Sequence, residues 1–217
     1  MIYGVMCINY TEKLILVLFV MLLSTGCARP ESSYEDFLPI DTSYPEQALL
    51  SNEPEIFLSG KNSHFTIRPR ASYRIGAVVR SKKAYKYDQL SEISPYDLAL
   101  VWGFLADEHF YKQVKIYQGG RRYFFRPRRG SQLSLEWIFL NSANHHIIPA
   151  NENIRKGLSS VRTDDRVELE GLLVDVYANV KGNTFNWNTS LVRNDRGDGS
   201  CEIIYLKKLK VNYRVYK

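Results

Sequence analysis

Apolar and polar residues alternate along several short segments of the chain, with the period of two that is expected of β-strands with one buried face. Two such runs flank Gly119 and Gly120 and predict a β-hairpin. Tyr, Phe and Trp make up 13% of the residues, an enrichment that favours strands over helices. Strands are therefore expected over residues 72–80, 115–125 (as the hairpin), 132–140, 166–177, 184–191 and 201–211.

Two segments have the signals of short helices. Ser94 and Pro95 precede an apolar run and match the cap and the first position of a helix over residues 94–107. Asn151 is the expected cap of a second helix. The apolar residues of that helix, at helical spacing, are Ile154, Leu158 and Val161.

The strand over 166–177 changes its apolar phase at Gly171. The apolar positions are Val167 and Leu169 before the glycine, then Leu172, Val174 and Val176 after it. A glycine where the inward face changes lets a strand coil around a small barrel. Together with a helix between two groups of strands, this pattern predicts an α+β, β-rich fold: a small antiparallel, OB-like barrel with two short helices. An irregular sandwich is the alternative.

The first 26 residues have the organisation of a signal peptide. Lys13 precedes ten consecutive apolar residues, 14–23, and three small residues then lead directly to Cys27. A helix needs about 20 apolar residues to cross a bilayer, so ten are too few to span one and fit the core of a signal peptide. An uncleaved anchor, or a start at Met6, is the alternative.

The junction at Cys27 resembles the lipobox of bacterial lipoproteins, although Ser24 stands three positions before the cysteine and the usual leucine is displaced to Leu23. In that family the thiol is diacylglycerated and the chain is cut just before the cysteine. The resemblance implies that Cys27 is the lipidation site and that its acyl chains anchor the protein in a membrane. Ala28, in place of aspartate, implies the outer membrane of the cell envelope, with the protein facing the periplasm.

The chain divides into regions of opposite charge. Residues 27–55 contain four prolines and seven acidic residues against one arginine, and they predict a flexible tether with a charge of −6. Because residues 1–26 carry no net charge and the whole chain carries +6, a single domain over 56–217 carries +12. This points to an anionic partner: an envelope polymer, an acidic protein face or nucleic acid. The alternative is that the cations are merely spread over a solvated surface.

The densest group of cations is RRYFFRPRR, residues 121–129. Arginines form forked hydrogen bonds to phosphates, and aromatic rings stack on bases or sugar rings. Alternation along a strand puts Arg122, Phe124 and Arg126 on one face. The alternative is that the aromatic residues face the core and the arginines line a solvated hairpin. The expected anion-binding residues are Arg121, Arg122, Phe124, Arg126, Arg128 and Arg129.

No recognisable catalytic motif or metal-binding pattern is present in the sequence. His145 and His146 are adjacent, so they point apart on an extended segment and do not form a pair of metal ligands. Phosphate-binding loops and dinucleotide fingerprints are absent from the sequence, and we expect no cofactor. A hydrolytic site would require His146, Asp175, Asp195 and Glu202 to converge, which their spacing does not indicate.

Three segments, NHHIIPAN, DDRVELEGLLVDV and WNTSLVRNDRGDGSCEIIYLKKLKV, resemble the C-terminal half of a group of uncharacterised bacterial proteins. The resemblance covers residues 73–211 and implies one intact domain, without implying an activity. The sequence as a whole therefore predicts a lipid-anchored envelope protein that serves as a non-catalytic binding or assembly module. A nuclease or glycan hydrolase is the alternative. The matching positions are Asn144, His146, Pro149, Trp187, Ser190, Leu191, Arg193, Asp195, Gly197, Gly199, Cys201 and Glu202.

Overall fold

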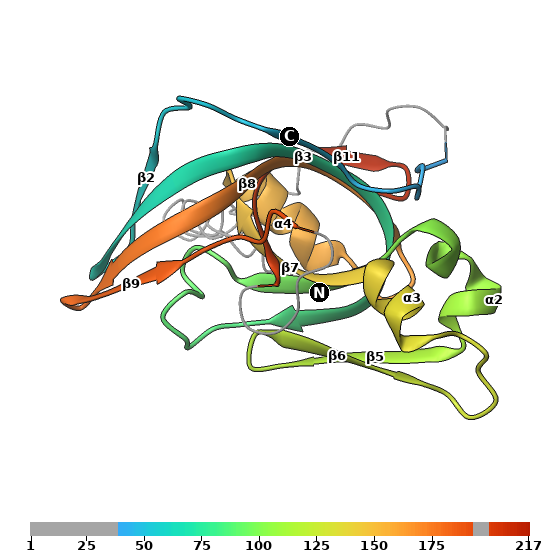
Figure 1. The fold of residues 1–217 in the computed structure, drawn as a ribbon. Helices are drawn as coiled ribbons and strands as arrows, with labels where there is room; N and C mark the ends of the chain where they lie inside the picture. Colours follow the sequence, from blue (N-terminus) through green and yellow to red (C-terminus); the bar gives the residue numbers. More distant parts are fainter. Residues whose placement is uncertain (1–38, 193–199) are drawn as a thin grey trace, which may run out of the picture. The chain divides into compact units, whose positions relative to one another are not determined.

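The computed structural model describes residues 39–192 and 200–217 and confirms a β-rich fold. Five strands close a ring of hydrogen-bonded pairs (Figure 1). The ring order is β3 (Ser63–Ala84), β4 (Tyr96–Val101), β7 (Ser142–Pro149), β10 (Glu202–Val211) and β8 (Arg166–Val180), which pairs with β3 again. Strands β7 and β10 run parallel, and all other neighbours in the ring are antiparallel.

Apolar side chains fill the interior of the ring. Tyr73 and Trp102 are among them, and both are buried. Helix α4 (Glu152–Ser160) adds Ile154 and Leu158 to the same cluster. The helix begins as the sequence predicts, because Asn151 Oδ1 accepts a hydrogen bond from the Ile154 N–H at 2.9 Å. The short strand β11 (Arg214–Tyr216) pairs with β10 beside this helix.

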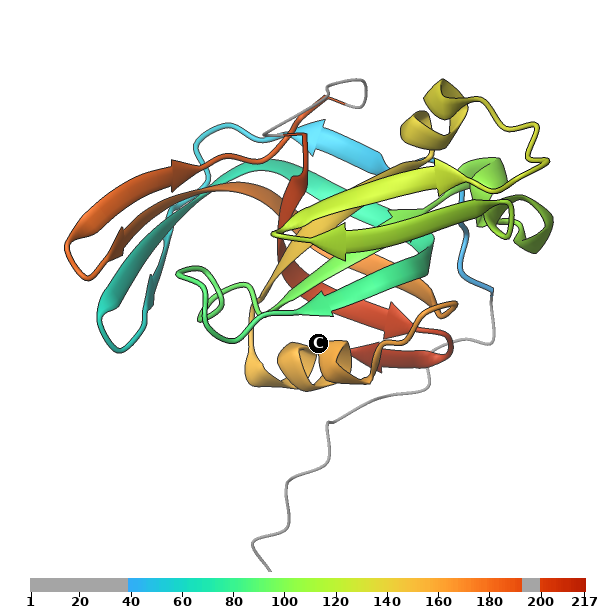
Figure 2. The same ribbon diagram turned by 90° about the horizontal axis from the view of Figure 1, so that it is seen from below.

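Strands β3 and β8 extend beyond the ring. Their register shifts between Pro69 and Ala71, where β3 has an extra residue. On the far side of this bulge they pair with β2 (Ile56–Ser59) and β9 (Asn183–Trp187), and the four segments form an extension that we call the wing (Figures 1 and 2).

The two apolar faces of β8 overlap just after Gly171 instead of changing there. Leu172 already packs against a second apolar cluster under the wing, together with Val174 and Val176, as the sequence predicts. The residues buried in the ring interior nevertheless continue to Leu173. The change of buried face lies opposite the bulge in β3, and this bulge cannot be predicted from the sequence of β8. Gly171 has a different role, since a Cβ there would lie 2.2 Å from the carbonyl oxygen of Tyr205.

Two predictions of element type were wrong. Residues 94–107, expected to be helical, form β4 and the 3₁₀ helix η1 (Gly103–Ala106). Because β4 lies between two strands and is buried on both faces, its apolar run shows no alternation. Residues 132–140, expected to be a strand, contain helix α3 (Leu135–Leu140), which begins where Ser134 Oγ accepts a hydrogen bond from the Trp137 N–H at 3.1 Å.

The segment between β4 and β7 also contains helix α2 (Glu108–Tyr111) and the hairpin of β5 (Val114–Gly119) and β6 (Arg122–Pro127). The hairpin predicted around Gly119 and Gly120 is confirmed. It lies across the outer side of the ring, in front of the ring strands in Figure 2.

The ordered domain begins before residue 56. Residues 46–49, expected to belong to a flexible tether, form strand β1 (Glu46–Leu49), which pairs with β3. All four side chains of β1 are exposed, so this strand depends on backbone hydrogen bonds and leaves no apolar pattern in the sequence. Ile40 is buried as well. Residues 1–38, with the predicted signal peptide and Cys27, lie outside the described residues.

Within residues 39–192 and 200–217, no helix is long and apolar enough to cross a membrane.

Candidate anion-binding face

The outward side of the β5–β6 hairpin combines cations with aromatic rings. Lys115 stands opposite Arg126 in the strand register, and Tyr117 stands opposite Phe124. The two rings are stacked, with centroids 5.3 Å apart and planes at 23°. About half of each ring residue is exposed, 48% for Tyr117 and 43% for Phe124. We call this surface the hairpin face; its residues are Lys115, Tyr117, Arg122, Phe124 and Arg126.

Arg122, Phe124 and Arg126 share this exposed face, as the alternation predicts. Arg128 and Arg129 follow the end of β6 and are exposed too. Residues 112–129 contain no Asp or Glu, so the cations have no acidic neighbour within the hairpin sequence. The hairpin face is therefore a concentrated positive surface with an aromatic centre.

The inward side of the hairpin holds it against the ring. Ile116 and Phe125 pack on an apolar cluster to which both β3 and β4 contribute. Tyr123 donates its hydroxyl hydrogen bond to the Ser142 carbonyl oxygen at 3.1 Å. Gln118 Nε2 donates to Asn144 Oδ1 at 2.6 Å. These contacts present the hairpin face on a fixed support.

Arg121 does not belong to the exposed face. Gly120 and Arg121 form the two-residue turn, with φ of 57° and 58°, the geometry of a type I′ hairpin turn. The Arg121 N–H donates to the Tyr85 hydroxyl at 3.1 Å, and its guanidinium donates to both carboxylate oxygens of Asp88 at 2.7 and 3.1 Å. Only 15% of the side chain is exposed. Arg121 thus anchors the turn instead of facing a ligand.

A buried polar cluster lies beneath the turn. Asp97 on β4 is fully buried, and its Oδ1 is 2.8 Å from His146 Nδ1 and 3.4 Å from Arg121 Nη1. The His146 ring packs against Trp187 at a centroid distance of 4.7 Å. The Arg121 guanidinium lies over the Tyr85 ring at 4.1 Å. We call these residues the support cluster: Tyr85, Asp97, Arg121, His146 and Trp187.

The support cluster raises the pKa of the Tyr85 phenol. Burial makes the largest contribution, and the nearby Asp97 carboxylate adds to it. The phenol therefore stays protonated well into the alkaline range, and its oxygen remains the acceptor for the Arg121 N–H.

Of the candidate catalytic residues, His146 and Glu202 do not converge. Glu202 is the register partner of His145, and its carboxylate is 3.8 Å from His145 Nε2. Since neighbouring positions of a strand face opposite sides, Glu202 lies on the other side of the sheet from His146. His146 is also buried and pairs with Asp97. Asp195 lies outside the described residues.

Metal-ligand groups are likewise missing from the described part of the chain. Among residues 39–192 and 200–217, no group of three His, Cys, Asp or Glu side chains is arranged to hold a metal ion.

Several residues of the site were missed from the sequence. Lys115 and Tyr117 could have been found, because a turn at Gly119 and Gly120 already places them on the same face as Arg122 and Phe124; the observed turn at 120–121 changes only which residues stand opposite them. Asp97 carried no such signal, because it was expected in the first turn of a helix.

His146 and Trp187, which belong to two segments of the predicted resemblance to uncharacterised bacterial proteins, meet in the support cluster. The resemblance itself and the lipobox at Cys27 stay predictions. Comparison of the chain with protein-family models, with curated proteins and with solved structures finds no match.

Proposed function

We propose that this protein is a non-catalytic binding module of the bacterial cell envelope that captures an anionic polymer on its hairpin face. The observation that carries the proposal is the exposed row of Arg122, Phe124 and Arg126, joined by Lys115 and Tyr117. Guanidinium groups bind phosphates through paired hydrogen bonds, and aromatic rings stack on flat or ring-shaped groups. The ligand class is therefore a phosphate-bearing polymer, either a nucleic acid or a phosphorylated envelope glycan.

The charge arrangement of the hairpin supports this assignment. Lys115 and Arg126 are directly opposite each other, and like charges in that position destabilise an antiparallel pair. A bound phosphate would relieve the repulsion. The support cluster and the apolar contacts beneath fix the hairpin before a ligand arrives, which reduces the entropy cost of binding.

The ring corresponds to an OB-like barrel in this proposal. Its strands in chain order are β3, β4, β7, β8 and β10, with α4 between the third and the fourth. OB-folds are five-stranded Greek-key barrels that bind oligonucleotides or oligosaccharides on the face of their second and third strands. In this protein the second and third strands are β4 and β7, and the hairpin covers their outer face. The ligand would therefore bind on the hairpin face instead of directly on these two strands.

The proposed location is the periplasmic side of the outer membrane, with the protein anchored by acyl chains on Cys27. The test is fatty acid labelling of the whole precursor in a bacterial host. Cys27→Ala should leave the precursor uncleaved and unlabelled. Normal labelling and cleavage of this variant would contradict the anchor.

The hydrolase alternative has less support. It required His146 to meet Asp195 or Glu202; Asp195 lies outside the described residues, and Glu202 faces the other side of the sheet. His146 is enclosed by Asp97 and Trp187, where a polymer backbone has no access to it.

The binding role is tested by titrating the protein with single-stranded DNA and, separately, with lipopolysaccharide. We expect binding to at least one of the two polymers, and the double variant Arg122→Ala with Arg126→Ala should lower that affinity and flatten its salt dependence. The matched control is Arg162→Ala with Lys207→Ala, which removes the same charge from exposed positions outside the hairpin. Equal losses in both double variants, or no binding of either polymer, would refute the hairpin face as the site.

A further inference from the structure

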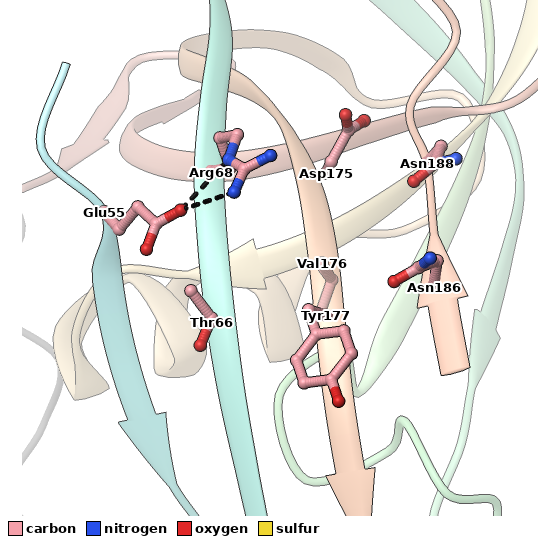
Figure 3. Close-up of a pocket in the computed structure, with 8 residues that line it drawn as sticks. All are labelled: Glu55, Thr66, Arg68, Asp175, Val176, Tyr177, Asn186 and Asn188. Atoms are coloured by element: carbon pink, nitrogen blue, oxygen red, sulfur yellow. Dashed lines mark hydrogen bonds and ion pairs between the residues drawn. The ribbon is translucent and has the colours of Figure 1, made fainter. Parts of the chain in front are cut away.

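A hollow surface lies on the outer side of the wing, away from the apolar cluster beneath it. It is a groove of about 290 Å³, just below the range of roughly 300–1,000 Å³ typical of small-molecule sites. Figure 3 shows its side chains on β3, on β8, on and just after β9, and on the segment that leads into β2. We call it the wing groove; the lining residues used here are Glu55, Arg68, Asp175, Tyr177, Asn186 and Asn188.

The strand register places these side chains in two rows across the sheet. Thr66, Tyr177 and Asn186 are successive partners on β3, β8 and β9. Arg68 and Asp175 are partners in the next row. The groove is therefore a grid of side chains on paired strands, whose spacing is fixed by backbone hydrogen bonds.

The charges of the wing groove are already paired. The Arg68 guanidinium donates to Glu55 Oε1, with its Nη2 and Nε at 2.9 and 3.0 Å. Arg70, on the same face at the bulge, pairs with Asp175. The other oxygen of Asp175 accepts the Thr189 N–H at 3.0 Å. Two cations thus balance two carboxylates, and the surface has no excess charge to attract an ion.

The uncharged side chains at the wing groove include aromatic rings and amides. Tyr177 is half exposed, at 50%, and Phe57 lies in the same row, opposite Thr66, with its ring open to solvent. Asn186 and Asn188 are exposed beside Tyr177 and offer both donors and acceptors. An aromatic ring packs against the apolar face of a sugar ring, while amides and paired charges match its neighbouring hydroxyl groups.

We infer that the wing groove binds a neutral saccharide chain. The paired arginines and carboxylates disfavour a phosphate polymer here, and the exposed ring with flanking amides favours an uncharged, hydroxyl-rich ligand. The chain would run across β3, β8 and β9, over Tyr177. Both carboxylates of the groove are held in ion pairs with arginines, and the inferred role is binding alone.

The test uses the isotope-labelled domain and two uncharged probes, the tetramer of N-acetylglucosamine and cellotetraose. Amide signals of residues 174–178 and 184–188 should shift on addition of at least one probe, with an affinity in the millimolar range or tighter. Tyr177→Ala should weaken that affinity about tenfold or more, since aromatic packing contributes most of the contact. The control Tyr213→Ala removes an equally exposed tyrosine outside the groove and should leave the affinity unchanged.

Asn186→Ala provides a second variant if Tyr177→Ala does not fold, and it should also weaken binding. The inference is overturned if neither probe shifts these amides at about 10 mM, or if neither groove variant changes the affinity. It stands apart from the proposed function, because Arg122→Ala with Arg126→Ala should leave saccharide binding intact. Loss of saccharide binding in that double variant would move the site to the hairpin.

Discussion

The hairpin face and the wing groove use the same residue types, but the hairpin face carries excess positive charge and the charges of the wing groove are balanced. Each presents arginines and aromatic rings on antiparallel strands. On the hairpin, Arg126 stands opposite a lysine and no acid occurs in the local sequence. On the wing, Arg68 and Arg70 are each joined to a carboxylate. Ligand class is therefore set by the neighbours of an arginine, not by the arginine itself.

The two surfaces also differ in what supports them. The hairpin also rests on an apolar cluster, but its turn is held in addition by ionic contacts of Arg121 with Asp88 and with the buried Asp97. The wing rests on an apolar cluster that includes Ile67 and Val176. An ionic support fails when one partner is removed, because the other is left buried without its counter-charge, whereas an apolar support loses stability in proportion to the volume removed. Mutations should therefore separate the two surfaces.

The largest expected effect follows from Asp97→Ala. Asp97 is fully buried and faces both Arg121 and His146, so its loss should lower the free energy of unfolding by about 3–5 kcal/mol. Denaturant unfolding measures this loss. Hydrogen exchange should show faster opening of hairpin amides than of wing amides.

Two further variants serve as controls for Asp97→Ala. Asp97→Asn keeps a hydrogen-bond acceptor and should cost less than the alanine variant. Glu108→Ala removes an exposed ion pair with Lys112 and should have no measurable effect. A loss below about 1 kcal/mol for Asp97→Ala would show that the turn is held by its other contacts.

Salt should separate the ligands of the two surfaces. If about four cations of the hairpin contact phosphates, the affinity for single-stranded DNA should fall about 50-fold between 50 and 200 mM salt. Saccharide binding to the wing should change less than about twofold, because no counterions are released. Calorimetric titrations across this range measure both. Parallel salt dependence of the two ligands would remove the electrostatic distinction.

Removing one aromatic ring from each surface in turn gives a third test. Phe124→Ala should reduce the affinity for single-stranded DNA by about 5- to 150-fold, the range for loss of one stacked base, and should leave saccharide binding unchanged. Tyr177→Ala should do the reverse. The two variants are matched controls for each other, since both remove a ring of similar exposure from a strand. Either variant weakening both ligands equally would indicate one shared site.

The sequence predicted the surface of the hairpin better than its support. Alternation along one strand was enough to place Arg122 and Phe124 on the same face, and the structure shows that this face is the exposed one. The role of Arg121 depends on a turn with positive φ and on Asp88, a residue 33 positions away in the chain. Such a partner is fixed only by the tertiary fold.

The errors in the fold have related causes. Strand β4 is buried on both faces, by the ring interior on one side and by the apolar cluster beneath the hairpin on the other, so its apolar run shows no alternation. Its sequence therefore matched a helix start at Ser94, and the role of Asp97 was hidden. The change of face in β8 originates at a bulge in β3, near Arg70. Both features belong to pairs of strands, and a periodicity read along one strand does not contain them. The register across the wing, which assembles Tyr177 with Asn186, was beyond prediction for the same reason.

The smallest expected effect tests the central difference between the surfaces directly. Lys115→Glu would turn the like-charged pair with Arg126 into an opposite-charged pair, the arrangement already present between Glu55 and Arg68 on the wing. The domain should become more stable by about 0.2–1 kcal/mol while its affinity for single-stranded DNA falls. Lys207→Glu, at an exposed position outside the hairpin, should leave the stability unchanged and controls for net charge.

Thermal unfolding at low salt measures the gain for Lys115→Glu, which should shrink as salt screens the pair. A gain in stability with undiminished DNA affinity would mean that the repulsion between Lys115 and Arg126 has no part in binding. No gain at any salt concentration would mean that the two cations point apart, and the hairpin face would then lose its electrostatic argument for a bound phosphate. A gain coupled to weaker binding would mean that the unpaired cations are kept at a cost in stability because the ligand supplies their counter-charge.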